Sequence, residues 1–152
     1  MFMQRDVAEL MRLMQALRRR RPPGHAFSAL AEYELTHSQG QALLTLQFDG
    51  PMTISTLAEQ VGCSVSACTG IVDRLEELKL ARRGPKPGDR RVVMVELSSK
   101  GNKLASKAVA VIQAHLSQVL GLLSAEDRKS FLEILRRLID AVEALSQTKP
   151  VS

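Results

Sequence analysis

Basic side chains gather in one short stretch of the sequence. Between Arg74 and Arg91 there are seven basic residues against three acidic ones, so this segment holds +4 of the formal net charge of +5. A local excess of positive charge is typical of a surface that binds nucleic-acid phosphates. The last three residues, Asp89-Arg90-Arg91, follow a Gly/Pro-rich stretch at 84–88. We therefore expect them at the exposed tip of a hairpin.

A second group of residues that could contact DNA has small polar side chains rather than charged ones. Ser64, Ser66 and Thr69 begin a segment that we expect to be helical from about 64 to 78, with Ser64 as its N-cap. A helix N-terminus offers hydroxyl and backbone N–H groups to a phosphate. The polar face of this helix is narrow, so it fits a major groove, and Arg74 is its one long donor for guanine or phosphate.

The other reactive residues predict neither catalysis nor a metal site. His25, His37 and His115 show no metal-ligand spacing, and no catalytic triad, phosphate loop or carboxylate pair with a base is evident. We therefore expect no enzyme and no cofactor. Cys63 and Cys68 form no disulfide framework and are interpreted as core or neutral thiols, with a redox-responsive regulator kept as an alternative.

The elements that position these residues are mainly helices. Apolar residues recur at three- and four-residue steps, and the helices expected from them span about 5–20, 25–34, 36–49, 55–61, 64–78, 101–121 and 124–147. Thr36 with Gln39 predicts a capping box, and Ser55 is expected to open its helix. Pro22-Pro23-Gly24 separates the first two helices.

Side chains of the last helix are expected to face inward. The residues in question are Phe131, Ile134, Leu138, Val142 and Leu145.

Between the helix at 64–78 and the next one, the spacing of the apolar residues changes to every second position. Val93, Val95 and Leu97 alternate with Val92, Met94 and Glu96, which predicts a strand after the basic tip.

These elements together predict a mainly α fold with a small β-hairpin. Two helices joined by a short turn after Gly62 match a helix-turn-helix, and the hairpin would be its wing. A chain of 152 residues suits one domain. Only 3% of the residues are aromatic, which argues against recognition of single strands by stacking. Neither a signal peptide nor a membrane span is indicated, so we expect a cytoplasmic protein without a membrane partner.

Several motifs in this order resemble the MarR family of bacterial transcriptional regulators. The segments that carry the resemblance are TISTLAEQVG at 53–62, GIVDRLE at 70–76, DRR at 89–91 and LSSKG at 97–101. The match runs without gaps from Leu35 to Gly101. Its most specific part is the wing motif followed by the Leu-Ser-x-x-Gly pattern.

The resemblance implies a homodimer that binds a palindromic operator in double-stranded DNA. It implies N-terminal dimerisation helices at 1–34, a winged helix-turn-helix at 35–100 and C-terminal dimerisation helices at 101–148. It further implies a repressor that a small phenolic or other anionic effector releases from DNA, with pocket residues left unassigned. A winged-helix module for protein contacts remains an alternative.

The resemblance also assigns roles in the wing. Arg91 would enter the minor groove, Asp89 would orient it, and Arg90 would contact the backbone. The DNA-contacting residues that we expect are Ser55, Ser64, Ser66, Ala67, Thr69, Gly70, Arg74, Lys86, Asp89, Arg90 and Arg91. This chain departs from the family at Lys79, which stands where a glycine is usual, and at Gly70, where many members carry a long basic residue. Readout is therefore expected to shift toward the wing.

Overall fold

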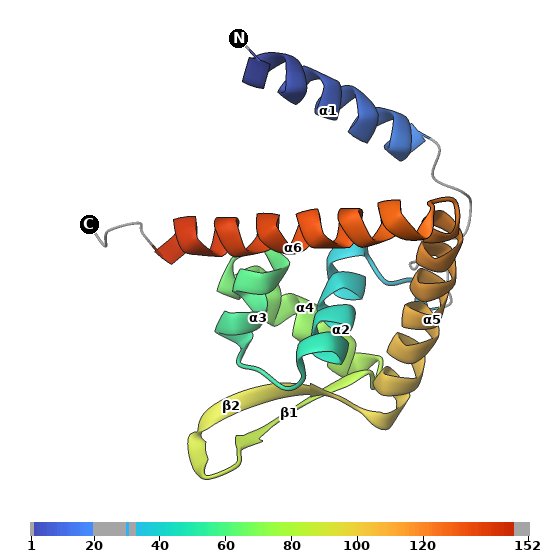
Figure 1. The fold of residues 1–152 in the computed structure, drawn as a ribbon. Coiled ribbons are helices and arrows are strands. Elements are labelled where there is room, and N and C mark those ends of the chain that lie inside the picture. Colours follow the sequence, from blue (N-terminus) through green and yellow to red (C-terminus); the bar gives the residue numbers. More distant parts are fainter. Residues whose placement is uncertain (1, 20–29, 31–32, 148–152) are drawn as a thin grey trace. The chain divides into compact units, whose positions relative to one another are not determined.

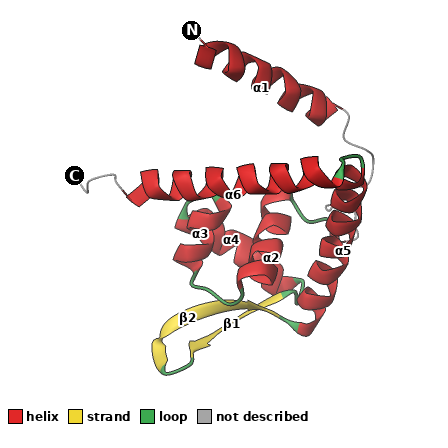
Figure 2. Ribbon diagram, in the orientation of Figure 1, coloured by secondary structure: helices red, strands yellow, loops and turns green. Residues whose placement is uncertain are grey.

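Helices dominate the protein, as the sequence predicts. The structure, a computed structural model, describes residues 2–19, 30 and 33–147 (Figure 1). Its elements are α1 (Phe2–Arg19), α2 (His37–Asp49), α3 (Ile54–Val61), α4 (Val65–Glu77), β1 (Ala81–Lys86), β2 (Asp89–Leu97), α5 (Ser99–Gly121) and α6 (Ala125–Gln147). Contacts divide the chain into two compact units, 1–111 and 112–152. A mainly α fold with one antiparallel hairpin is thus confirmed (Figure 2).

Side-chain caps set where three of the helices begin. Thr36 and Gln39 form the predicted capping box at α2, because the Gln39 N–H reaches the Thr36 hydroxyl and the Thr36 N–H reaches the Gln39 side chain. Ser64 caps α4 as predicted, with its hydroxyl accepting the Ala67 N–H at 3.1 Å. The helix expected to open at Ser55 begins one residue earlier, at Ile54. Thr53 caps it, because the Thr53 hydroxyl accepts the Thr56 N–H at 3.2 Å.

The hairpin is longer and its turn shorter than the sequence predicts. Residues 84–86 pair within β1, so the connecting turn is only Pro87-Gly88. Gly88 has φ +85°, which is the value that the third residue of a type II turn with proline at its second position requires. The pairing register shifts between Pro85 and Lys86. Asp89, Arg90 and Arg91 therefore lie at the start of β2 rather than in a loop.

Only the base of the hairpin joins the core. The strand predicted from the alternation is present, and Val95 and Leu97 near its end are buried, whereas Val93 is 50% exposed. The outer part of the hairpin extends beyond the helices that could cover it. Met52 pairs with Val95 through backbone hydrogen bonds of 3.1 and 2.7 Å, which ties the segment before α3 to the base of β2.

The core of the described part lies among α2, α3, α4, the base of the hairpin and the first half of α5. Side chains from all of these elements belong to one buried cluster, and every one of them is apolar. The largest of them are Leu30, Leu43, Leu57, Leu75, Leu80, Val72, Val95 and Cys68. A core of aliphatic side chains agrees with the low aromatic content of the chain.

A tight junction connects α4, the hairpin and α5. Lys79 has φ +59°, the left-handed value expected at this position after the helix. The Ser98 hydroxyl donates to the Lys79 carbonyl at 2.6 Å, and the Lys100 ammonium donates to the Leu78 carbonyl at 3.0 Å. A Cβ on Gly101 would lie 1.9 Å from the Leu80 carbonyl oxygen. The start of α5 can pack this closely on the chain after α4 only with glycine at position 101.

The apolar side chains of α6 that were expected to face inward are exposed in the isolated chain. Phe131, Ile134, Leu138, Val142 and Leu145 are 50–71% exposed. The helix itself begins as predicted, since the Ser124 hydroxyl accepts the Asp127 N–H at 3.0 Å. The prediction of burial was wrong for one chain because periodicity shows only that a face is apolar, without showing what covers it.

The first helix shows the same property. Val7, Leu10, Met11 and Met14 in α1 are 50–62% exposed. The predicted helix at 25–34 and the break at Pro22-Pro23-Gly24 lie outside the described residues, apart from isolated positions. Two helices of the described chain, α1 and α6, therefore carry apolar faces that are open to solvent.

Candidate nucleic-acid interface

A short turn holds α3 and α4 together as a helix-turn-helix. Gly62 ends α3 in the left-handed conformation, and its N–H donates to the Ala58 carbonyl at 2.9 Å. The Cys63 N–H reaches the same carbonyl at 3.0 Å. Ser64 then starts α4 from an extended conformation. These bonds fix the direction in which α4 leaves the turn, and they leave its polar face uncovered.

The beginning of α4 carries the small polar residues that the sequence singles out. Ser64, Ser66 and Ala67 are exposed, whereas Thr69 is partly covered. The Ser64 oxygen caps the Ala67 N–H and keeps its own proton available for a phosphate oxygen. The Thr69 hydroxyl donates to the Val65 carbonyl at 2.9 Å, so its proton is already used within the helix. This end of α4 can bind an anion through Ser64 and first-turn N–H groups.

Farther along α4, Gly70 and Arg74 lie on the exposed face, and Arg74 already has a partner. Its guanidinium binds the Glu77 carboxylate at 3.0 Å, with side-chain exposures of 44% and 65%. Apart from the neighbouring residues and the backbone of α4 itself, no atom of the described residues lies within 4 Å of a Cβ built on Gly70. Ser55 is exposed on α3. The surface of α4 therefore combines small side chains with one arginine whose charge is largely balanced.

Arg83 joins the start of the hairpin to α4. Its guanidinium binds Asp73 at 2.8 Å and also forms a close ion pair with Glu76. Its backbone N–H donates to the second Glu76 oxygen at 2.8 Å. Burial alone would lower the pKa of Arg83, but the hydrogen bonds and charges of Asp73 and Glu76 outweigh it and raise that pKa. We call these three residues the Arg83 clamp.

The sequence analysis did not predict the Arg83 clamp. It counted Arg83 only as one of the seven basic residues between Arg74 and Arg91. Asp73 and Glu76 stand three residues apart and so share one helix face. That spacing was a usable signal, since a carboxylate pair on a helix can hold one arginine from a following strand. Arg82 is likewise paired, with Glu96 at 2.7 Å across the hairpin. Neither arginine is free for phosphate.

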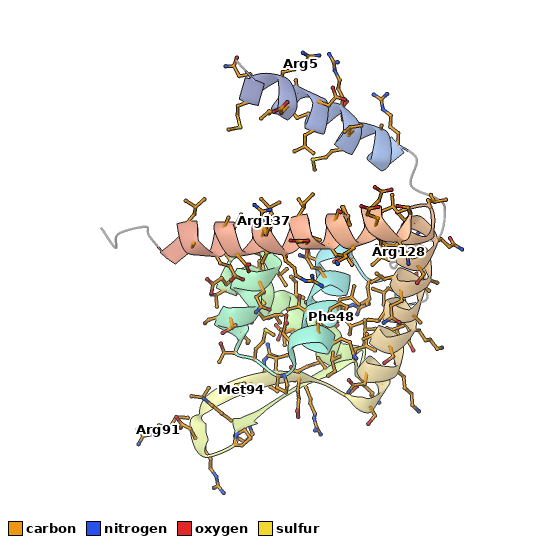
Figure 3. All side chains as sticks on the ribbon, in the orientation of Figure 1. Arg5, Phe48, Arg91, Met94, Arg128 and Arg137 are labelled. Carbon is orange, nitrogen blue, oxygen red and sulfur yellow. The ribbon has the colours of Figure 1, made fainter. Side chains whose placement is uncertain are left out.

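The outer end of the hairpin holds the unpaired positive charge of this region. We define the hairpin end as residues 86–91. Among the described residues, Lys86, Arg90 and Arg91 form no ion pair within the 4 Å limit, and all three are exposed. The Asp89 carboxylate accepts the backbone N–H of Arg91 at 3.0 Å. Figure 3 shows the Arg91 side chain extending outward from this end of the hairpin.

The contact between Asp89 and Arg91 refines the expected role of Asp89. The carboxylate holds the backbone of Arg91, two residues away, in an Asx-type turn rather than gripping its guanidinium. The guanidinium therefore keeps all five donors for a partner. Three positive side chains against one negative leave the hairpin end with a net charge of +2. It is the most basic part of the candidate interface.

Other kinds of site find no support in the described part of the chain. No group of three or more His, Cys, Asp or Glu side chains is placed to hold a metal ion there. No described helix is long and apolar enough to cross a membrane. Cys63 is partly exposed, Cys68 is buried, and both are free thiols.

Known proteins with similar sequences are DNA-binding regulators. Residues 35–93 match the model of the MarR family. The chain is 33% identical over 110 residues to the HTH-type transcriptional repressor NicR of Pseudomonas putida, covering 72% of this chain and 70% of that protein.

Solved structures agree with the sequence comparison. A MarR family protein from Bacillus stearothermophilus has a TM-score of 0.74 at 29% identity, covering 92% of this chain and 97% of that one. NadR, solved in complex with 4-hydroxyphenylacetate, has a TM-score of 0.64 at 23% identity, covering 86% and 89%. The similarity to NadR shows only that the two proteins share a fold.

Proposed function

This chain belongs to the MarR family of transcriptional regulators, and we propose that it represses transcription by binding a palindromic operator as a homodimer. The observation that carries the DNA-binding role is the charge arrangement of the hairpin. Arg74, Arg82 and Arg83 are each held by a carboxylate, while Lys86, Arg90 and Arg91 are exposed and unpaired in the described chain. A protruding end with free guanidinium groups suits the negative potential of a minor groove.

The expected contacts divide between the two halves of the motif. In the proposed complex, Ser64 and Ser66 face phosphates at one edge of the major groove, with Ser55, Ala67 and Thr69 beside them. Gly70 and Arg74 face the groove itself, and Arg74 leaves Glu77 to do so. At the hairpin end, Arg91 enters the minor groove while Lys86 and Arg90 contact the backbone.

The homodimer is the part of the proposal that explains the exposed apolar faces. Phe131, Ile134 and Leu138 recur along one side of α6, and each is at least 50% exposed. Burying a fully exposed side chain of this kind gains about 1.5–3 kcal/mol, and covering the exposed part of each of these gains a share of that free energy. A second copy of the chain offers the same surfaces, and a two-fold dimer matches the symmetry of a palindromic site.

Release by a small effector is the finer part of the proposal. NadR, whose fold this chain shares, was solved with a phenolic acid anion. We propose a small phenolic or other anionic effector of the same chemical class for this chain and assign no pocket residues to it. A repressor of this kind works in the cytoplasm, where the chromosome lies, and has no need of catalysis.

Binding of the purified protein to labelled duplexes tests the proposal. We expect the duplex from the region upstream of its own gene to bind more tightly than a scrambled duplex of equal length and composition. The half-sites should lie about one helical turn apart. The logarithm of the association constant should fall by about 0.9 per neutralised phosphate as salt rises. Equal affinity for both duplexes at every salt concentration would reject sequence-specific binding.

Oligomeric state is measured separately by light scattering after size exclusion. A dimer mass that persists at the protein concentrations used for DNA binding supports the proposal. Ile134→Glu and Leu138→Glu, placed on the exposed face of α6, should shift the mass toward the monomer. Lys129→Glu, an exposed α6 change outside the apolar face, is the matched control. A monomeric wild type would contradict the dimer.

A further inference from the structure

One apolar side chain lies exposed at the start of the recognition helix α4. Val65 is the first residue of this helix and is 52% exposed, between Ser64 and Ser66, which are exposed as well. The buried residues of the helix begin three residues later, at Cys68. Val65 therefore belongs to the surface that we expect to face DNA rather than to the core.

The polar groups near Val65 keep few hydrogen-bond donors free for base edges. The Thr69 hydroxyl donates to the Val65 carbonyl at 2.9 Å, so its proton is used within the helix. The Arg74 guanidinium is paired with Glu77 at 3.0 Å, and Gly70 brings no side chain to the groove. The methyl groups of Val65, in contrast, are available. This part of α4 is therefore better suited to apolar contact with a base than to hydrogen bonding.

The Val65 side chain is also held in a defined position. The Ser64 hydroxyl accepts the Ala67 N–H at 3.1 Å. The Ser64 carbonyl accepts the Cys68 N–H at 2.9 Å, which fixes the first turn of α4 around Val65. A valine in a helix has one strongly preferred rotamer. Its two methyl groups therefore lose little conformational entropy when they meet a partner.

We propose that Val65 recognises the C5 methyl group of a thymine in the major groove of the operator. Among the four bases of DNA, thymine alone presents a methyl group there. Contact between this group and the valine methyl groups removes apolar surface from water on both partners. The inference rests on the proposed function and adds to it a residue that discriminates thymine from the other bases.

The symmetry of the proposed dimer doubles this contact. Each copy of the chain carries one Val65, so two thymines related by the two-fold axis of the operator are expected to be read, one in each half-site. Burial of one methyl group is expected to change affinity about fourfold, and loss of both contacts about 16-fold. The contact neutralises no phosphate, so its loss should leave the salt dependence of binding unchanged.

Uracil in place of thymine tests the inference on the DNA side, because it keeps the base pair and removes only the methyl group. The duplex from the region upstream of the gene is made with uracil at one thymine at a time and titrated with the full-length protein. We expect one thymine in each half-site at which uracil lowers affinity about fourfold, and about 16-fold for the pair, with the salt slope unchanged. An operator in which no thymine is sensitive to uracil would overturn the inference.

Val65→Ala tests the inference on the protein side. The variant should bind the thymine operator about 16-fold more weakly than the wild type, and the two uracils should then cause little further loss, since both changes remove the same contact. Val93→Ala is the matched control, because Val93 is 50% exposed and lies on the hairpin. It should keep the full uracil effect. A uracil effect of wild-type size in Val65→Ala would overturn the inference.

The molecular mass and the binding of a scrambled duplex show whether Val65 has another role. Val65→Ala should bind the scrambled duplex as tightly as the wild type does, and its mass by light scattering should be the same. A lower mass would mean that Val65 contacts a second copy of the chain, and it would overturn the inference. A wild type that prefers no operator would overturn the proposed function and the inference together, whereas specific binding without a uracil effect would overturn the inference alone.

Discussion

The recognition helix α4 and the hairpin end differ in how their polar groups are held. On α4 the Ser64 and Thr69 hydroxyls bond to the helix backbone, and Arg74 is paired with Glu77. At the hairpin end, Lys86, Arg90 and Arg91 are exposed without an ion pair in the described chain. One half of the interface is thus fixed before any DNA arrives, and the other half keeps its charge available.

This difference indicates how the two halves divide the work of binding. A helix with prearranged groups loses little conformational entropy when it meets a groove, so it contributes shape and register. Free arginines contribute electrostatic energy, which depends on salt and on groove width. The Arg83 clamp joins the two halves, because it links β1 to the face of α4 that carries Asp73 and Glu76.

The variant with the largest expected effect disrupts the junction of α4, the hairpin and α5, from which both halves of the interface extend. Gly101→Ala places a Cβ 1.9 Å from the Leu80 carbonyl oxygen, and only backbone could move away. We expect a loss of about 3 kcal/mol or more in the free energy of unfolding, at the upper end of overpacking effects. Urea denaturation followed by circular dichroism measures it.

Gly70→Ala is the matched control for that change. Among the described residues, no atom outside the adjoining backbone of α4 lies within 4 Å of its Cβ position, and the residue sits inside α4. We expect it to stabilise the protein by about 0.5–1 kcal/mol, the helix-propensity difference between glycine and alanine. If Gly101→Ala were as harmless as Gly70→Ala, the close approach at the junction would be refuted.

The next change removes one of the three unpaired positive charges of the hairpin end. Arg91→Ala should cost about 1–3 kcal/mol of operator binding, reduce the salt slope by about 1, and leave the unfolding free energy unchanged. Titration of a labelled operator at several salt concentrations measures both quantities. Arg82→Ala, on the same hairpin but already paired with Glu96, is the control and should change affinity much less. Equal losses in the two variants would argue against a special role for the end.

The clamp is tested by removing its centre. Arg83→Met should destabilise the protein by about 1–2 kcal/mol, because two partly exposed carboxylates lose a hydrogen-bonded charge. It should also weaken operator binding with little change in the salt slope, since Arg83 contacts no phosphate in this account. A change in slope as large as that of Arg91→Ala would show that Arg83 is itself a phosphate ligand.

The variant with the smallest expected effect releases Arg74 of α4 from its ion pair with Glu77. Glu77→Gln removes the partner of Arg74 and one negative charge from the DNA-facing helix. We expect operator affinity to rise by less than about 1 kcal/mol, because exposed ion pairs contribute little. Glu143→Gln, an exposed carboxylate of α6, serves as the control for net charge. A fall in affinity on Glu77→Gln would mean that the pair positions Arg74 for DNA.

Local patterns in the sequence predicted most of the helices and strands and the order in which they follow one another along the chain. Thr36 with Gln39 and the Ser64 cap were evident because a cap depends on a few neighbouring residues. Lys79, which stands where the family usually has a glycine, has the left-handed backbone that a glycine adopts most easily. The DNA contacts of the site residues remain predictions, which the variants above test.

What the sequence did not reveal depends on contacts between distant residues. The pairing of Arg83 with Asp73 and Glu76 needs the hairpin to fold back along α4. The exposure of Val93 and of the α6 apolar face depends on what lies opposite each of them. Periodicity identifies an apolar face, but the covering element belongs to tertiary or quaternary structure.

The most direct test compares Arg91→Ala with Arg74→Ala on the same operator duplex, at one salt concentration and with matched unfolding free energies. The central claim is that the hairpin end supplies more of the binding free energy than the single arginine of α4. We expect Arg91→Ala to lose several-fold more affinity than Arg74→Ala, because Arg74 must first leave Glu77. An equal or greater loss for Arg74→Ala would contradict it.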